Sequence, residues 1–198
     1  MSLLDDLHKK ILTCTECTLH VGRKNAVPGE GRPDADIMFV GEGPGAEEDE
    51  QGRPFVGRSG QLLTQMLTQV GIERQSVFIG NIVKCRPWQK NAETGAIENR
   101  KPAPEEMHTC IHYLHAQIAL INPKLLVFLG GTALEAFFGP KYILSRVIGQ
   151  FIRYHGQPVF VTWHPSFVLR SPRNRADYLK HFKKIRQLAD RSFQFPEK

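Results

Sequence analysis

The chain has 198 residues, a length that suits one domain with a full hydrophobic core and is short for two. Its 41% hydrophobic and 23% charged residues are typical of a globular protein, and no apolar run is long enough to cross a membrane. The N-terminus is acidic and lacks the apolar core of a signal peptide. We therefore expect a single domain over residues 1–198, located in the cytoplasm and without a membrane partner.

The net charge of +6 is distributed unevenly along the chain. Residues 141–198 hold 12 Lys and Arg against 3 Asp and Glu, whereas the rest of the chain holds 14 against 17. A basic segment of this kind is typical of proteins that bind a polyanion, nucleic acid first. A solvated helix face explains the same charge equally well.

The predicted elements alternate between helix and strand. In chain order they are a helix at 3–12, a strand at 36–41, a helix at 61–70, a strand at 77–83, a helix at 104–121, a strand at 125–129, a helix at 132–138, a strand at 158–162 and a last helix. Asn174 is the predicted cap of that last helix, and its apolar stripe consists of Tyr178, Leu179, Phe182, Ile185 and Leu188. The short apolar runs indicate buried strands, so we predict a mainly parallel four-stranded sheet with helices on both faces. Polar residues 88–101 are predicted to be a surface insertion.

An unusual loop follows the first predicted strand. Its sequence is Gly-Glu-Gly-Pro-Gly-Ala-Glu-Glu-Asp over Gly41–Asp49, and a second Gly-rich run follows at Gly52–Gly60. Open α/β sheets bind ligands just outside the carboxyl ends of their strands. The loop therefore carries acids, an aromatic residue and an Arg to a place where this fold class builds sites.

A second chemical segment, His164-Pro165-Ser166, follows the last predicted strand. If the strands are parallel, His164 lies at the same sheet edge as Glu42. A lone His is more often structural than catalytic, but a His-Pro-Ser turn opposite an acidic Gly-rich loop favours function.

Four cysteines are present, Cys14, Cys17, Cys85 and Cys110. The first two form a C-x-x-C pair after the first helix, which in a cytosolic protein indicates a metal or redox site before a disulfide. Two ordinary buried thiols beside that pair are the simpler alternative. Zinc and a [4Fe–4S] cluster both accept four thiolates, and one close pair with two distant single ligands favours the cluster over zinc.

Taken together, these motifs resemble the family 4 uracil-DNA glycosylases. The resemblance extends over residues 14–170 and rests on the four cysteines and five motifs in order, which are Gly41-Glu42-Gly43-Pro44-Gly45, Gly52-Arg53-Pro54-Phe55-Val56-Gly57, Asn81, Lys84-Cys85-Arg86-Pro87 and His164-Pro165-Ser166. It implies a three-layer α/β/α fold and a [4Fe–4S] cluster on the four cysteines. It also implies excision of uracil from single- or double-stranded DNA, by hydrolysis of the N-glycosidic bond to leave an abasic site, and we expect a monomer.

The residue types of these motifs suit uracil recognition. Uracil must leave the base stack before its bond to the sugar can be cut, and Phe55 offers a surface on which it can stack. The Asn81 amide can accept from N3–H and donate to O4, a pattern that cytosine presents in reverse. Core packing and a strand-end cap are the structural alternatives for Phe55 and Asn81. Gly41, Glu42 and Gly43 would form a wall of the same pocket.

The expected chemistry assigns separate roles to three residues. A neutral His164 donates an N–H to uracil O2, where negative charge develops as the bond breaks. Glu42 steadies the cationic sugar or orients the attacking water. Glu48 lines the pocket and helps to exclude the methyl group of thymine, whereas Glu47 and Asp49 receive no role.

Several residues are expected to contact DNA around this pocket. Ser59 and Gly60 open a helix, so their N–H groups could hold a phosphate with help from Arg58. Leu169 is expected to enter the duplex as an apolar wedge. The remaining expected DNA contacts are Ser166, Arg170, Arg173 and Arg175.

Two departures from the family pattern bear on function. Gly43 stands where the family usually has Ala, and neither residue can activate water. The insertion at 88–101 lies where a related iron–sulfur group carries a His that traps the sugar covalently, but here it holds no His, which predicts turnover. The rival functions are a non-catalytic or covalently trapping uracil-DNA-binding iron–sulfur protein and, as a milder alternative, a mismatch-specific or hypoxanthine-removing glycosylase.

Overall fold

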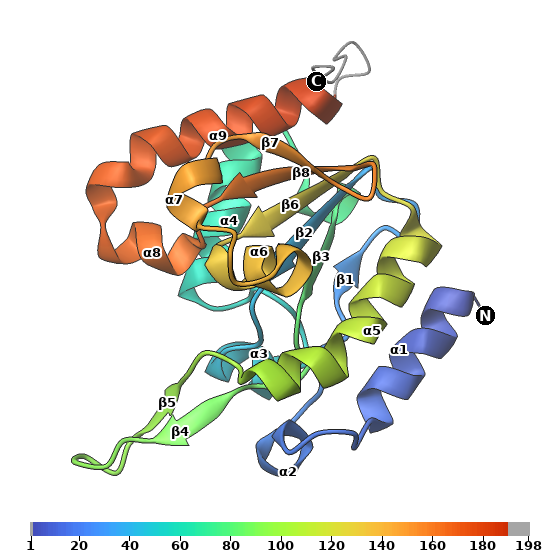
Figure 1. Ribbon diagram of the computed structural model, residues 1–198, viewed down its shortest axis with the longest axis vertical. Helices are drawn as coiled ribbons and strands as arrows, with labels where there is room; N and C mark the ends of the chain where they lie inside the picture. The colour runs from blue at the N-terminus through green and yellow to red at the C-terminus, as the bar shows by residue number, and fades with distance from the viewer. Residues whose placement is uncertain (1, 190–198) are drawn as a thin grey trace.

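A six-stranded sheet forms the centre of the computed structural model, which describes residues 2–189 (Figure 1). Its strand order is β1-β3-β2-β6-β8-β7, and the four inner strands are parallel, with β1 and β7 as antiparallel edges. The strands are β1 (Glu30–Gly31), β2 (Ile37–Gly41), β3 (Phe78–Asn81), β6 (Leu125–Leu129), β7 (Phe151–Tyr154) and β8 (Gln157–Thr162). The α/β class and the mainly parallel sheet are confirmed.

The predicted number of four strands is wrong, because the sheet has two further strands at its edges. β1 has only two residues, and β7 is half-buried or exposed along its length. Neither produces the continuous apolar run of the inner strands, in which every residue of β2 and β6 is buried.

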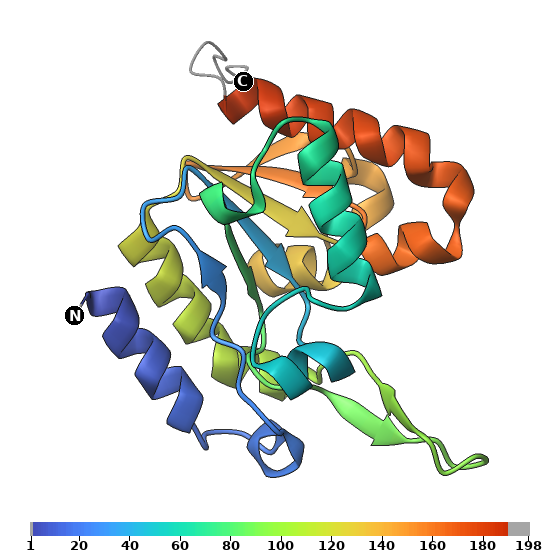
Figure 2. The ribbon, with the colours of Figure 1, turned by 180° about the vertical axis from the view of Figure 1, so that it is seen from behind.

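Helices cover both faces of the sheet, which gives the expected three layers (Figures 1 and 2). Alternate side chains of β2 point to opposite faces, with Met38 and Val40 in one core cluster and Ile37 and Phe39 in the other. The first cluster packs under α1 (Leu3–Thr13), α5 (Pro104–Ile121) and α6 (Gly131–Phe138), and the second under α4 (Arg58–Gln69), α8 (Pro165–Arg170) and α9 (Arg175–Ala189).

Several element boundaries differ from the sequence-based prediction. Helix α4 begins three residues earlier, and Asn174 ends a 3₁₀ turn, Pro172–Asn174, before α9 begins. Four short helices were not predicted, namely α2 (Leu19–Gly22), α3 (Ala46–Gln51), α7 (Leu144–Val147) and α8, and the 3₁₀ turn Arg74–Ser76 completes the elements. Of the predicted α9 stripe, Tyr178, Phe182 and Ile185 are buried and Leu179 is half-buried, whereas the side chain of Leu188 lies outside the described residues.

The predicted surface insertion at 88–101 forms a β-hairpin that projects from the body (Figure 1). Its strands are β4 (Trp88–Lys90) and β5 (Ile97–Asn99), and every residue of β5 is exposed. The base of the hairpin is held by Arg100, whose guanidinium donates to both carboxylate oxygens of Glu106 at 2.6 and 2.8 Å. Among the described residues, no helix has the length and apolar character that a membrane crossing requires.

Parallel pairing brings the carboxyl ends of the four inner strands to one edge. Gly41 of β2 lies opposite Asn81 of β3, and Leu129 of β6 lies opposite Thr162 of β8. Each strand therefore releases its next residues on the same side of the sheet, and this is the side on which ligands bind in open α/β sheets.

Candidate functional site

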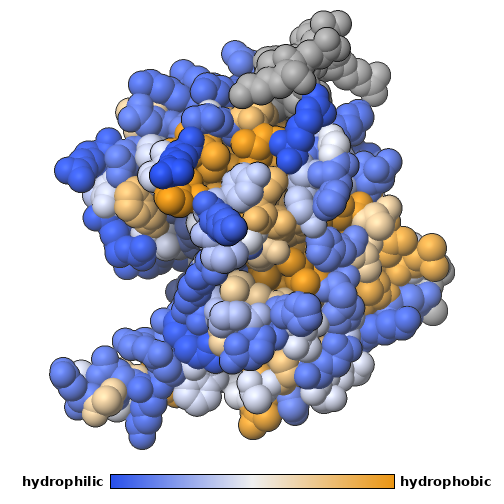
Figure 3. Space-filling model, viewed as in Figure 1, coloured by the Kyte–Doolittle hydropathy of each residue, from blue (hydrophilic) through white to orange (hydrophobic). Residues whose placement is uncertain are grey.

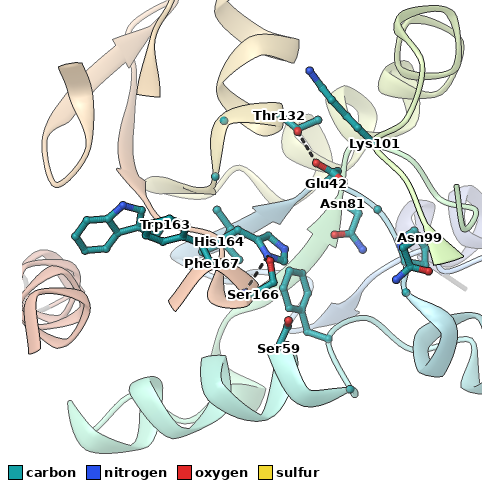
Figure 4. A pocket seen from close by; sticks show the side chains of 18 of the residues that line it. Glu42, Ser59, Asn81, Asn99, Lys101, Thr132, Trp163, His164, Ser166 and Phe167 are labelled. Carbon is teal, nitrogen blue, oxygen red and sulfur yellow. Dashed lines mark hydrogen bonds between the residues drawn. The ribbon is translucent and has the colours of Figure 1, made fainter. Parts of the chain in front are cut away.

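A cavity of about 930 Å³ lies at this carboxyl edge. It is lined by the ends of all four parallel strands, by the start of α4, by α8 and by the base of the hairpin (Figure 4). A hollow on the outer surface separates the projecting hairpin from the body above it (Figure 3). The volume of the cavity is within the range of small-ligand pockets, which is about 300–1,000 Å³.

Most of the predicted site residues line this one cavity. They are Glu42, Gly43, Glu48, Phe55, Arg58, Ser59, Asn81, His164, Ser166 and Arg170. Gly41 lies directly behind the wall, where a Cβ would lie 2.5 Å from Asn81 Oδ1 and 2.5 Å from Phe55 Cζ. Gly60 and Leu169 do not line the cavity.

Phe55 is held in a conformation that bulky residues rarely adopt. Its φ is +50°, in the left-handed region, and its ring lies 5.8 Å from that of His164. The backbone of Gly60 passes so close that a Cβ there would overlap the Phe55 carbonyl oxygen. Strained residues of this kind cluster at functional sites, so the conformation favours a role for Phe55 beyond core packing.

Asn81 carries an orphaned polar atom. The residue is only 1% exposed, and its Oδ1 has no hydrogen-bond partner in the described part of the chain. A buried acceptor without a donor costs about 1–3 kcal/mol. A ligand that brings an N–H group to this position would relieve that cost, which makes Asn81 a candidate recognition residue.

The hydrogen bonds of His164 define which ring nitrogen carries the proton. The backbone N–H of Ser166 points at Nδ1 at 3.2 Å, and the Ser166 hydroxyl lies 2.8 Å from the same atom. Because a backbone N–H can only donate, Nδ1 is an acceptor and the proton of the neutral ring is on Nε2. Ser166, predicted to contact DNA, therefore also orients His164.

Burial of the ring, together with the positive charge of Arg170, lowers the pKa of His164 to about 4. A pKa this far below the ordinary value leaves the imidazole neutral at physiological pH. His164 can thus act as a neutral donor through Nε2–H.

Glu48 lines the cavity as predicted, but backbone N–H groups hold its carboxylate. Its Oε1 accepts from the backbone N–H groups of Val56 and Gly57, both at 2.9 Å, and its Oε2 accepts from Gly45 N–H at 3.0 Å. Both oxygens are thus occupied by the backbone of the two Gly-rich runs. This geometry favours a structural role in which Glu48 ties the runs together.

Glu42 is half-buried at the end of β2, and its contacts leave one oxygen available. Oε2 accepts a hydrogen bond from Thr132 Oγ1 at 2.5 Å (Figure 4). Within the described residues, Oε1 has no hydrogen-bond partner. Glu42 is the cavity carboxylate best placed to act on a ligand.

Of the DNA contacts expected on α4, Arg58 and Ser59 line the cavity, whereas Gly60 is buried and does not. Arg58 is exposed and Ser59 is half-buried at the first turn of this 12-residue helix, whose free N–H groups suit a phosphate. Arg170, the last residue of α8, and Arg173, three residues later, are both exposed. Arg175 donates to Gln65 Oε1 at 2.7 Å.

Leu169 is poorly placed for the predicted wedge. It is half-buried and packs against the second core cluster. Phe167, two residues earlier on α8, is 38% exposed, lines the cavity and stacks on Trp163 at 6.0 Å. No helix was predicted over residues 165–170, so the sequence did not show which side chain faces out. In the structure, α8 turns Phe167 and Leu169 to different sides.

The four cysteines gather beside the first core cluster, where Cys85 and Cys110 are buried and Cys14 and Cys17 are half-buried. Burial raises the pKa of Cys110 to about 12, and the neighbouring thiols Cys85 and Cys17 add to this effect. Two N–H groups already face the sulfurs, from Arg23 to Cys85 at 3.0 Å and from the backbone of Lys84 to Cys110 at 3.3 Å. Donors of this kind stabilise thiolates, so the chemistry of the set fits a thiolate-ligated group.

The described residues nonetheless include no group of three or more metal-binding side chains spaced to hold a single ion. The four cysteines are supported as ligands only by the N–H groups that face their sulfurs and by the chemistry of thiolates. The choice between a cluster and zinc stays a prediction.

The sequence did not reveal several cavity residues. Thr132 follows β6 after Gly130 and Gly131. This Gly-rich strand end resembles the one that identified Glu42, so the same sequence pattern could have predicted Thr132 as a site residue. The other unpredicted lining residues include Asn99, Lys101, Trp163 and Phe167.

Comparison with known proteins identifies the family. The sequence profile of the uracil DNA glycosylase superfamily matches residues 28–189. The chain belongs to the uracil-DNA glycosylase superfamily. A Type-4 uracil-DNA glycosylase of Thermotoga maritima is 48% identical over 174 residues, which cover 87% of this chain and 86% of the relative. A second, from Sulfurisphaera tokodaii, is 42% identical over 204 residues, which cover 96% and 86%.

A Type-5 uracil-DNA glycosylase of Thermus thermophilus is 33% identical over 141 residues, which cover 59% of this chain and 60% of the relative. The two Type-4 enzymes thus match more of the chain at higher identity than this Type-5 enzyme. The family 4 resemblance inferred from the motifs is confirmed.

The low pKa of His164 has a direct consequence for pH dependence. Because the folded-state value of about 4 lies below the ordinary 6.5, the ring stays neutral as the pH falls from about 8 to about 5. We expect ¹⁵N NMR of the imidazole to report the Nε2–H tautomer throughout this range. Titration of His164 near its ordinary pKa would contradict the assignment.

Proposed function

We propose that this chain excises uracil from DNA by hydrolysing the N-glycosidic bond and leaving an abasic site. The observation that carries the proposal is the meeting of Glu42, Asn81 and His164 around one cavity, at the carboxyl ends of three of the four parallel strands, with Phe55 beside them. Relatives named Type-4 uracil-DNA glycosylase support the same conclusion.

Recognition would depend on Asn81 and Phe55. Flipped uracil would stack on the Phe55 ring, its N–H at position 3 would donate to the orphaned Asn81 Oδ1, and its O4 would accept from the Asn81 amide. Cytosine has an acceptor at position 3 and a donor at position 4, so it would leave the same amide unsatisfied.

Bond cleavage would depend on His164 and Glu42. As the bond from C1′ to N1 breaks, its electron pair moves to the base, and His164 Nε2–H stabilises the charge that develops at uracil O2. Glu42, negatively charged, stabilises the cationic sugar, and its free Oε1 accepts the proton of the water that adds to C1′. Glu48 would act only through the loop that it braces.

The insertion offers nothing for the covalent alternative. Residues 88–101 form a hairpin without His, so the sugar has no imidazole there to which it could bond. We propose release of the product and turnover, on single- or double-stranded DNA, by a cytoplasmic monomer.

We also propose a [4Fe–4S] cluster on Cys14, Cys17, Cys85 and Cys110. Such a cluster would link the segment after α1 to the end of β3 and to α5, which suits a structural role. The two N–H···S contacts to Cys85 and Cys110 would stabilise the thiolates that bind it.

Replacing Asn81 tests the recognition step. The substitution Asn81→Ala removes both base contacts, and we expect uracil release from an oligonucleotide with one uracil to fall by about 100-fold or more. Release is measured as alkali-cleavable product, with a thymine oligonucleotide as the substrate control. Asn99→Ala, at an exposed residue that also lines the cavity, is the matched variant and should retain activity within about threefold.

Full activity of Asn81→Ala would contradict the recognition model. Equal release of uracil and thymine by the unaltered protein would contradict the proposed function.

The cluster has a spectroscopic test. Protein purified without oxygen should absorb at about 400 nm and contain about four iron atoms per chain, and Cys110→Ser should lose both signals. Stoichiometric zinc with no absorbance in the visible range would contradict the cluster.

The choice between Phe167 and Leu169 as the wedge is testable by comparing substrates. Phe167→Ala should slow uracil release from duplex DNA by about tenfold but from single strands by less than about threefold, because only a duplex has a gap to fill. Leu169→Ala should instead lower the free energy of unfolding, by about 1–2 kcal/mol, because Leu169 packs against the core. The opposite pattern would restore Leu169 as the wedge.

A further inference from the structure

One of the four parallel strands ends in a residue with no role so far. β3 leads to Asn81, β2 to Glu42 and β8 to His164. β6 lies between β2 and β8 in the sheet, and after Gly130 and Gly131 it leads to Thr132 in the first turn of α6. This fourth strand end also lines the cavity.

Thr132 makes one contact that concerns the proposed chemistry. Its Oγ1 lies 2.5 Å from Oε2 of Glu42, and the two residues are 90 positions apart in the sequence (Figure 4). A carboxylate can only accept, so the threonine hydroxyl is the donor. Hydrogen bonds from a hydroxyl to a charged carboxylate are short and stronger than neutral ones.

The donor is rigidly placed, whereas the acceptor is not. Thr132 is 8% exposed, its side chain is β-branched, and its neighbours Ala133 and Leu134 are fully buried in the first core cluster. Glu42 is half-buried and has three side-chain torsions, so the strand alone leaves its carboxylate free to turn. The contact with Thr132 removes this freedom.

The contact also gives the two carboxylate oxygens of Glu42 different surroundings. Oε2 is occupied by Thr132, while Oε1 has no hydrogen-bond partner among the residues that the structure describes. One oxygen is thus anchored to the sheet edge through α6, and the other is available to a ligand in the cavity.

We propose that Thr132 is a positioning residue, which holds the Glu42 carboxylate so that Oε1 faces the sugar carbon and the attacking water. The inference rests on the proposed function, in which Glu42 acts at that carbon. Misplacement of a reacting group by about 1 Å can cost about 100-fold in rate, so a hydroxyl that touches no substrate can still control the reaction.

The test compares Thr132→Val, which keeps the shape and removes the donor, with Thr132→Ser, which keeps the donor. Single-turnover release of uracil is measured with saturating enzyme, and the Kd for uracil-containing DNA is measured by fluorescence anisotropy. We expect Thr132→Val to slow release by about tenfold or more with Kd changed by less than about twofold, and Thr132→Ser to stay within about threefold of the unaltered protein. Thr132→Ala serves as the second variant without a donor if Thr132→Val does not fold.

A double substitution separates positioning from general stability. If Thr132 acts through Glu42, then adding Thr132→Val to Glu42→Gln should change the remaining rate by less than about twofold, because the carboxylate it positions is gone. Equal slowing in both backgrounds, or a Thr132→Val rate equal to that of the unaltered protein, would overturn the inference. Absence of uracil release from the unaltered protein would instead overturn the proposed function, so the two failures are distinct.

Discussion

The parallel pairing of β3, β2, β6 and β8 is the constraint on which the rest of the site depends. The register sets Gly41 opposite Asn81 and Leu129 opposite Thr162, so four strands end at one edge and deliver their next residues to one cavity. Strands buried on both faces tolerate little change in register. The distances between the recognition group and the catalytic groups are therefore set by the core of the sheet, and the loops only complete the walls.

Much of this arrangement could be predicted from the sequence. Continuous apolar runs such as Leu125–Leu129 are required where helices cover both faces of a strand, so they identify the inner strands. Gly-rich or His-Pro sequences directly after those runs then located Glu42 and His164 at a common edge. The Gly-Gly-Thr after β6 carries the same kind of signal and would have identified Thr132.

The remaining features depend on contacts that local sequence does not encode. Edge strands β1 and β7 lack a buried run because one side of each pairs with no strand of the sheet. Glu48 has the side chain of a possible catalytic acid, and local sequence does not show that its carboxylate accepts hydrogen bonds from three backbone N–H groups. Likewise, α8 has six residues, and its turn decides that Phe167 rather than Leu169 is exposed at the cavity.

The most direct test of the account is a crystal structure of the protein with free uracil bound. The account predicts that the base lies on the Phe55 ring, with N3 and O4 within hydrogen-bond distance of the Asn81 amide and O2 within reach of His164 Nε2. It also predicts that Glu42 keeps its contact with Thr132 while Oε1 faces the position of the sugar. Uracil bound elsewhere, or bound here without contact to Asn81, would contradict the central claim that the aligned strand ends form a uracil site.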